Sequence, residues 1–119
     1  MPRAQDFDDL LENLPLPPAS FFILFALADA AKHGYRIMQE IHELSGSTFS
    51  IGPATLYTTI KKLSDQGMIS ETSEFSEDRR RTYALTPLGR RLLRAELHRQ
   101  EQLLDLARRK KIIGIGALK

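Results

Sequence analysis

Residues 52–67 read GPATLYTTIKKLSDQG, and this stretch decides how the rest of the chain is interpreted. Pro53 favours the first position of a helix, where its missing N–H would have no helical partner, and Gly67 favours a helix end. The pattern therefore predicts a helix from Pro53 to about Gln66. One face of it is apolar at i, i+4 and i+7, with Leu56, Ile60 and Leu63. That face should be buried, and the opposite face is polar.

Two further helices are predicted before this one. Residues 19–31, ASFFILFALADAA, are apolar on nearly all sides, which is typical of a buried helix. Residues 32–34 interrupt that pattern. Residues 35–45, YRIMQEIHELS, carry an apolar stripe at helical spacing and predict a second helix. Residues 48–51 alternate polar and apolar side chains, which predicts a short strand.

A hairpin and a long helix are predicted after it. Residues 68–74 and 80–85 have the composition of two strands joined by a short tip. Thr86 is a good N-cap and Pro87 a good first residue for a helix that runs to about Lys111. The order helix, helix, short strand, helix, hairpin, long helix is that of a winged helix-turn-helix protein.

The predicted fold class is therefore mainly α with a small β-hairpin wing, a winged helix-turn-helix plus a long C-terminal helix. Four parts are expected along the chain: an N-terminal extension (1–18), a winged helix-turn-helix DNA-binding domain (19–86), a C-terminal dimerisation helix (87–111) and a flexible tail (112–119). In such a domain the second and third helices form the reading unit and the hairpin forms the wing.

The composition favours a binding protein. The formal net charge is only +2, but residues 61–111 hold 13 Lys and Arg against 8 Asp and Glu. This asymmetry is typical of a surface that faces nucleic acid, although a solvated helix surface gives the same pattern. There is no cysteine, and the three histidines lack the spacing of zinc ligands. We therefore expect no enzyme activity, no cofactor and no metal.

The longest apolar stretch, residues 19–31, is too short to span a bilayer. The N-terminus is acidic where a secretory signal would be basic and then apolar. These features predict a cytoplasmic protein without a membrane partner.

Four motifs occur in a fixed order: His33-Gly34-Tyr35, Pro53-Ala54-Thr55-Leu56-Tyr57, Leu63 through Gly67-Met68-Ile69, and Arg81-Thr82-Tyr83-Ala84-Leu85-Thr86 with Gly89. Over about residues 20–95 the set resembles the PadR family of bacterial transcriptional regulators, in a short form with a single C-terminal helix. The resemblance implies a homodimer, a palindromic operator in double-stranded DNA, and repression relieved by a small-molecule effector or another signal. Gly52 stands where the family often has serine, and the wing tip is acidic where relatives often carry glycines.

Two groups of side chains are candidates for DNA contact. The helix offers Thr55, Tyr57, Thr58, Lys61 and Lys62, and the wing offers Arg79, Arg80 and Arg81. Residues near the N-terminus of a recognition helix meet base edges, and lysines neutralise phosphates. Because strand side chains alternate, Arg80 should face away from Arg79 and Arg81. Tyr57 stays open between inward packing and a phosphate contact. The alternatives are a solvated polar face, and a winged helix that binds other proteins without specific DNA binding.

The long helix carries apolar residues at alternating four- and three-residue spacing, as in a coiled-coil seam. Its members are Leu93, Leu97, Gln100, Leu104 and Ala107, widened by Leu92 and Leu103. The seam extends beyond what a chain of 119 residues covers with its own helices, so it predicts a dimer interface. Packing on the first apolar helix of the same chain is the alternative.

Three phenylalanines, Phe21, Phe22 and Phe25, lie in the first apolar helix. They have two interpretations, a pocket for a small-molecule effector and ordinary core packing, of which core packing is the more common use of aromatic residues.

Overall fold

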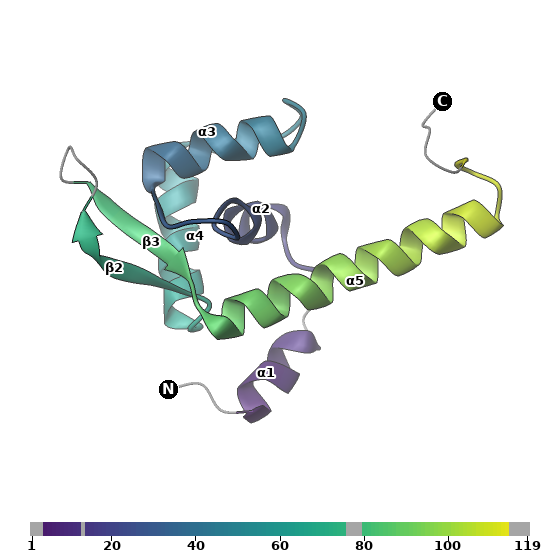
Figure 1. The fold of residues 1–119 in the computed structure, drawn as a ribbon, viewed down its shortest axis with the longest axis horizontal. Coiled ribbons are helices and arrows are strands. Elements are labelled where there is room, and N and C mark those ends of the chain that lie inside the picture. The colour runs from purple at the N-terminus through teal and green to yellow at the C-terminus, as the bar shows by residue number, and fades with distance from the viewer. Residues whose placement is uncertain (1–3, 13, 76–79, 115–119) are drawn as a thin grey trace.

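The computed structural model describes residues 4–12, 14–75 and 80–114, and within these ranges the chain forms five helices and three strands (Figure 1). The elements are α1 (Ala4–Leu11), α2 (Pro18–Ala26), β1 (Lys32–His33), α3 (Gly34–Leu44), α4 (Pro53–Asp65), β2 (Ile69–Phe75), β3 (Arg81–Leu85) and α5 (Pro87–Arg109). The predicted fold class is confirmed: a mainly helical chain with a hairpin wing and a long last helix.

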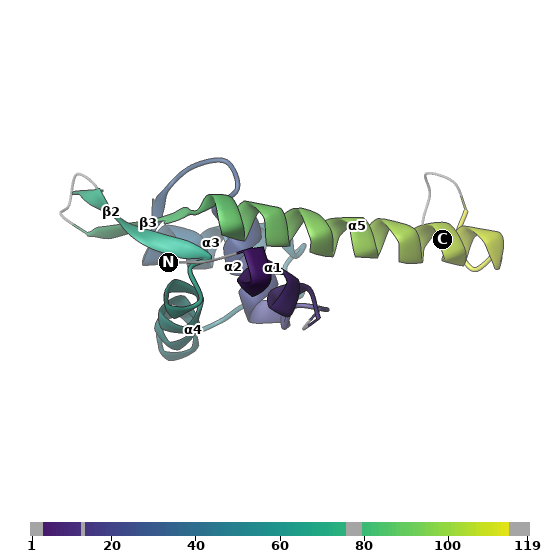
Figure 2. The same ribbon diagram turned by 90° about the horizontal axis from the view of Figure 1, so that it is seen from below.

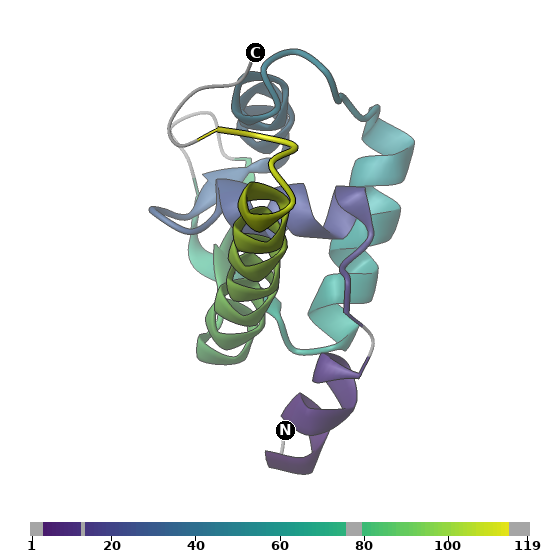
Figure 3. The ribbon, with the colours of Figure 1, turned by 90° about the vertical axis from the view of Figure 1, so that its right-hand side faces the viewer.

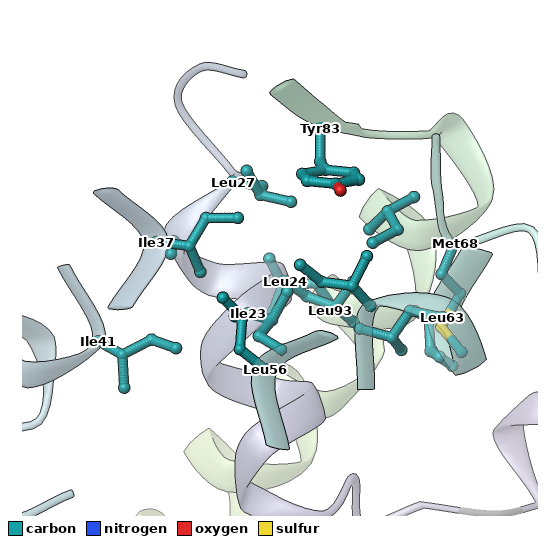
Figure 4. Close-up of a cluster of buried hydrophobic side chains, with 14 residues drawn as sticks. Ile23, Leu24, Leu27, Ile37, Ile41, Leu56, Leu63, Met68, Tyr83 and Leu93 are labelled. Carbon is teal, nitrogen blue, oxygen red and sulfur yellow. The ribbon is translucent and has the colours of Figure 1, made fainter. Parts of the chain in front are cut away.

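The centre of the core is α2, because its sequence is apolar on nearly every side. Ile23 and Leu24, and Leu27 at its C-cap, are at most 2 % exposed. Helices α3, α4 and α5 all contact α2. Figure 4 shows side chains from these helices, such as Ile37 and Leu56, gathered around Ile23 and Leu24. The predicted buried helix is thus confirmed in its position.

The end of α2 differs from the prediction, because the helix stops at Ala26 and does not continue to residue 31. The side chain of Lys32 donates from Nζ to the Ala26 carbonyl at 2.5 Å. Arg90 of α5 donates to the Ala28 carbonyl at 3.0 Å. Lys32 thus satisfies one of the carbonyl groups that a helix end leaves without partners, and Arg90 satisfies a carbonyl in the turn that follows, so the chain turns there at little cost.

The strands form one antiparallel sheet in the order β1-β3-β2. The hairpin of β2 and β3 is the predicted one. Strand β1 was not predicted: Lys32 pairs with Tyr83, and His33 pairs with Thr82. The residues between α2 and α3 therefore form an edge strand as well as a helix break. Two residues are too few to show the alternation by which a strand is recognised.

The predicted strand over residues 48–51 is wrong, because these residues form a turn followed by a loop. Ser45 provides the physical reason. Its Oγ accepts a hydrogen bond from the Phe49 N–H at 3.0 Å and donates to the Phe49 carbonyl at 2.9 Å. The Phe49 ring stacks on Phe22, with ring centroids 5.2 Å apart. The polar–apolar alternation thus reflects a ring packed against the core from a loop.

Helices α4 and α5 begin at the predicted prolines, and a shared cap connects them. Thr86 Oγ1 accepts from the Gly89 N–H at 3.0 Å and donates to the Gly67 carbonyl at 2.6 Å. Gly89 is needed because a Cβ there would lie 2.9 Å from the carbonyl carbon of Met68. The start of α5 is therefore fixed to the end of α4 and the base of the wing.

Helix α5 has 23 residues, and its second half extends beyond the rest of the protein (Figures 1 and 2). Helix α1 contacts α5, and the view along α5 shows α1 on the opposite side of the molecule from α3 (Figure 3). Of the predicted tail, residues 115–119 lie outside the described residues. No helix in the described ranges is long and apolar enough to cross a membrane.

Candidate nucleic-acid interface

Helix α4 presents one face to the core and the other to solvent. Leu56, Ile60 and Leu63 are at most 4 % exposed, as their spacing predicts. The other face is polar, and all five predicted DNA-contact residues on it are exposed: Thr55, Tyr57, Thr58, Lys61 and Lys62. Thr59 is partly buried, and its hydroxyl donates to the Thr55 carbonyl at 2.7 Å.

The N-terminus of α4 is free of any side-chain cap. Gly52 is the N-cap residue, with φ −86° and ψ 174°, and no side chain accepts a hydrogen bond there. Pro53 follows at the first helical position and has no N–H. The remaining first-turn N–H groups and the positive end of the helix dipole are suited to a phosphate group. The glycine in place of a serine thus leaves this end open to an outside acceptor.

Tyr57 connects α4 to the start of α3. A Cβ added at Gly34 would lie 2.9 Å from Tyr57 Cζ and 3.2 Å from Leu56 Cδ2. Two of the sequence motifs therefore meet in space, because only glycine at position 34 lets the ring approach this closely. The tyrosine is still 49 % exposed, so one part of it packs on α3 and another part remains on the polar face.

Lys61 and Lys62 are neighbours in sequence but have different surroundings. Lys61 Nζ lies 3.1 Å from Asp65 Oδ2, in an exposed ion pair one helical turn apart. Lys62 has no ion pair with any residue in the described ranges, and it lines a cavity beside the N-terminal segment. The full charge of Lys62 is therefore available to an anion, whereas that of Lys61 is partly neutralised.

The wing arginines are also in different places. Arg79 lies outside the described residues. The guanidinium carbon of Arg80 lies 5.6 Å from the centroid of the Tyr35 ring, a cation–π contact to the start of α3. Arg81 Nη1 lies 3.5 Å from Glu71 Oε1 on the neighbouring strand. Arg80, which precedes β3, and Arg81, its first residue, thus have different partners on different sides, as predicted.

Tyr35 was missed in the sequence analysis as a candidate. It is 54 % exposed at the first turn of α3, beside Arg80. The signal was present in the sequence, because a large aromatic residue stood on the polar side of a helix that belongs to the reading unit. The side chain of the preceding His33 caps α3, with Nδ1 accepting from the Arg36 N–H at 3.1 Å.

The predicted leucine seam of α5 has two parts in the structure, an inner part that is buried and an outer part that is largely exposed. Leu92 and Leu93 are 1 % and 4 % exposed within the core of the same chain, so their assignment to a dimer interface is corrected. Leu97 is partly buried and packs against that core. Further along, Leu103 and Leu104 are 51 % and 49 % exposed. The remaining predicted members, Gln100 and Ala107, are partly buried.

A buried carboxylate lies where the covered part of the seam ends. Glu96 is 2 % exposed, and its oxygens accept from Arg99 Nε at 2.6 Å and from Gln100 Nε2 at 3.4 Å. The backbone N–H of Leu16 also donates to it, at 3.3 Å. Burial by itself would raise the pKa of the Glu96 carboxyl, but the hydrogen bonds and the Arg99 charge outweigh it and lower the pKa. Glu96 thus fastens the N-terminal segment to α5.

The three phenylalanines of α2 pack in an aromatic cluster. The ring of Phe21 lies 5.2 Å from that of Phe22 and 5.6 Å from that of Phe25. All three pack against the core, which supports the ordinary interpretation over an effector pocket. In the described part of the chain, no group of three or more His, Cys, Asp or Glu could hold a metal ion.

An exposed recognition helix with an open N-terminus, supported by two helices and flanked by a hairpin, places this chain among the winged helix-turn-helix DNA-binding proteins. Residues 23–95 match the transcriptional regulator PadR-like family. The chain belongs to this family, as its sequence motifs predict. The family consists of DNA-binding transcriptional regulators, which are not enzymes.

Two relatives show the extent of the similarity in sequence. The chain is 34% identical to transcriptional regulator Rv3488 of Mycobacterium tuberculosis over 82 residues, covering 68% of this chain and 74% of that protein. It is 36% identical over 85 residues to an uncharacterized 37.1 kDa protein in transposon TN4556 of Streptomyces fradiae. That match covers 71% of this chain but only 24% of the length of the transposon protein.

Two solved structures show the similarity in fold. A PadR family regulator from Clostridium difficile R20291 has a TM-score of 0.63 and 25% identity, covering 82% of this chain and 100% of that one. Bacillus subtilis PadR in complex with operator DNA has a TM-score of 0.58 and 28% identity, covering 66% of this chain and 45% of that one.

Proposed function

We propose that the chain is a homodimeric, sequence-specific repressor that acts in the cytoplasm, binds a palindromic operator and is released by a small-molecule effector or another signal. The observation that carries this proposal is the outer face of α4, which is polar, exposed and open at its N-terminus. The similar Bacillus subtilis protein is described with operator DNA, which supports the same class of partner here.

In this proposal α4 lies in the major groove. The hydroxyls of Thr55 and Thr58 bond base edges near the N-terminus of the helix, and a threonine methyl can pack on a thymine methyl. Tyr57 contributes the exposed part of its ring. Lys62 neutralises a phosphate, and Lys61 does so less strongly because Asp65 already pairs with it.

The wing contributes contacts beside the recognition helix. Arg80 extends along the start of α3, stacked on Tyr35, and is directed at the minor groove next to the bases that α4 reads. Arg81 supports phosphate binding after its exposed ion pair with Glu71 opens, and Arg79 is proposed for the same role from the sequence alone.

The dimer forms through the outer part of α5. Leu103 and Leu104 are half exposed on a helix that extends beyond its own domain, with Leu97, Gln100 and Ala107 beside them. A two-fold axis here would bury the leucines of both copies and present two α4 helices to half-sites about 34–36 Å apart.

A fluorescence anisotropy titration of the full chain against labelled promoter duplex tests the proposal. We expect the logarithm of the affinity to fall linearly with the logarithm of the salt concentration, because phosphate contacts release counterions. Thr58→Val, which keeps the shape and removes the hydroxyl, should change the preference among operator variants more than the affinity for unrelated DNA. Binding without salt dependence, or equal affinity for all duplexes, would contradict the proposal.

A further inference from the structure

Tyr35 and Arg80 meet where the start of α3 lies beside β3 of the wing (Figure 1). Strand β1 pairs with β3 in an antiparallel register that places His33 opposite Thr82. Followed two residues further, the same register brings Tyr35 opposite Arg80. The guanidinium carbon of Arg80 lies 5.6 Å from the centroid of the Tyr35 ring, in agreement with that register. The contact between the ring and the cation is therefore a consequence of how the sheet is paired.

The start of α3 is held on two sides, so the Tyr35 ring has a defined position. His33 caps the helix, with Nδ1 accepting from the Arg36 N–H at 3.1 Å. On the side of α4, a Cβ added at Gly34 would lie 2.9 Å from Tyr57 Cζ, so the two helices are in close contact there. The first turn of α3 is therefore fixed between β3 and the recognition helix α4.

Two other cations near this helix start are paired with a carboxylate. Lys32 Nζ lies 3.3 Å from Glu40 Oε2, and Arg36 Nη2 lies 3.4 Å from Glu40 Oε1. The cation over the Tyr35 ring is Arg80, which comes from the wing. The ring is half exposed, so it lies at the surface and supports a side chain that reaches outward.

A tyrosine ring and a carboxylate hold an arginine in different ways. Arg81 Nη1 lies 3.5 Å from Glu71 Oε1, and this ion pair has to open before Arg81 binds a phosphate. The face of the Tyr35 ring attracts a guanidinium without cancelling its charge, so this contact can persist on DNA. An arginine that is already fixed in direction loses less side-chain entropy on binding. The contact with Tyr35 therefore prepares Arg80 for one particular site.

We propose that Tyr35 is a positioning residue that directs Arg80 into the minor groove beside each half-site and so makes the protein prefer a narrow minor groove there. This step rests on the proposed function, in which α4 reads the adjacent major groove. A narrow minor groove has an enhanced negative potential that attracts arginine, and runs of A·T pairs have this shape. The preference thus concerns base pairs that α4 does not touch.

Selection of duplexes from a randomised library by the full chain tests the proposal and supplies the operator. We expect the unchanged chain to recover a palindromic core flanked by runs of A·T pairs. Tyr35→Phe keeps an aromatic ring and should recover both features, whereas Tyr35→Leu should recover the same core without a flank preference. A core without a flank preference in the unchanged chain would overturn the role of Tyr35 alone. Failure to recover any core would overturn the proposed function and that role with it.

Three flanks on the selected core then separate groove shape from base identity. Fluorescence anisotropy compares runs of A·T, G·C and I·C pairs, because inosine lacks the amino group that guanine places in the minor groove. Tyr35→Leu should weaken binding to the A·T and I·C flanks about two- to tenfold, the cost of immobilising one long side chain, and should leave the G·C flank nearly unchanged. A preference for A·T over both other flanks would indicate reading in the major groove and would overturn the proposal.

Arginine variants test whether Tyr35 acts through Arg80. Arg80→Gln should lose the flank preference by itself, and Tyr35→Leu added to it should have no further effect. Arg81→Gln is the matched control and should weaken binding to all three flanks by a similar factor, with the preference kept. A second loss on adding Tyr35→Leu to Arg80→Gln would show that Tyr35 contacts DNA itself. Equal losses for Tyr35→Phe and Tyr35→Leu would assign the effect to the hydroxyl, and either result would overturn the positioning role.

The free protein provides a readout that does not depend on DNA. The Tyr35 ring should shift the NMR signals of the Arg80 δ-methylene protons upfield in the unchanged chain and in Tyr35→Phe, and Tyr35→Leu should return them to their ordinary positions. Thermal unfolding followed by circular dichroism should show that Tyr35→Leu remains folded, because the side chain is half exposed. Arg80 signals that do not respond to Tyr35→Leu would show that the ring does not hold the arginine in solution, and would overturn the proposal.

Discussion

Helix α4 and the outer part of α5, residues 100–109, both expose a face that the rest of the chain does not cover, and the two faces have opposite chemistry. The face of α4 carries threonines and lysines, which water solvates well. The outer part of α5 carries Leu103, Leu104 and Leu106, which are 51 %, 49 % and 47 % exposed. A polar face is stable in water until DNA binds, whereas a row of half-exposed leucines favours a permanent apolar partner.

The same contrast exists within α5. Its inner part, residues 87–99, carries Leu92 and Leu93, which α2 and its neighbours bury. The apolar pattern continues into the outer part without a change of period, but there the domain has ended (Figure 1). One sequence pattern thus serves the core of the chain first and, in the proposed dimer, an interface afterwards. Substitutions in the inner part should therefore lower the free energy of unfolding, whereas substitutions in the outer part should weaken the proposed dimer.

The largest effect is expected in the inner part. Leu92→Ala removes a side chain that is 1 % exposed and leaves a cavity among packed neighbours, so the free energy of unfolding should fall by about 2–5 kcal/mol. Urea denaturation followed by circular dichroism measures this, and Leu44→Ala, at a leucine that is 40 % exposed at the end of α3, is the exposed control. A loss below about 0.5 kcal/mol, the range of a surface substitution, would show that Leu92 is not a core residue in solution.

The next effect is expected in the outer part. Leu104→Glu places a charge twice in the proposed interface, once in each copy, and should convert dimers to monomers while the helical content stays the same. Gln102→Glu, on the polar side of α5, is the control and should remain dimeric. Sedimentation velocity checks both variants. A Leu104→Glu chain that still sediments as a dimer would place the interface on another surface.

The sequence was informative where a pattern is local. Proline at a helix start, Thr86 as a cap and the spacing of Leu56, Ile60 and Leu63 depend only on neighbours along the chain, and the structure agrees with them. Patterns that depend on the fold were less informative. The leucines of α5 have one period, and only the place where the domain ends separates core from exposed surface. The short strand β1 exists only because β3 lies beside it.

Glu96 is another example of what a sequence cannot reveal. It stands on α5 among many charged residues, and nothing nearby marks it as buried. Its partners come from the next turn of α5 and from Leu16, 80 residues away along the chain. The predicted strand over residues 48–51 failed for a related reason, because the Ser45 side chain, and not a neighbouring strand, satisfies the Phe49 backbone.

A third, smaller effect should come from the boundary between the inner and outer parts of α5. Glu96→Gln removes the charge that Arg99 and the Leu16 N–H stabilise, and should lower the free energy of unfolding by about 1–3 kcal/mol at neutral pH. The pKa of this carboxyl is lowered from its ordinary value of 4.5 in the folded state. The stabilisation is therefore complete above about that pH and is lost as the pH falls through the folded-state pKa.

Denaturation of the two chains across pH checks this expectation. The difference between the unchanged chain and Glu96→Gln should be constant near neutrality and should shrink in the acid range. Glu101→Gln, an exposed carboxyl on the same helix, is the control and should show little difference at any pH. A Glu96→Gln difference that grows toward acid would mean that the folded-state pKa is raised, with burial dominant over the hydrogen bonds.

The smallest effect is expected on the polar face of α4, and it distinguishes two adjacent lysines. Lys62→Ala should weaken promoter binding by about fivefold for all sequences and reduce the slope of log affinity against log salt by about one, because one phosphate contact is lost. Lys61→Ala should do less, since Asp65 already shares the charge of Lys61 at 3.1 Å. Asp65→Asn then provides the reciprocal check: by freeing Lys61 it should strengthen promoter binding and steepen the salt dependence.

Equal losses for both lysines would mean that the Lys61–Asp65 pair opens on DNA at no cost. The two residues would then contribute as one cationic face, and the difference between them in the free protein would have no effect on binding.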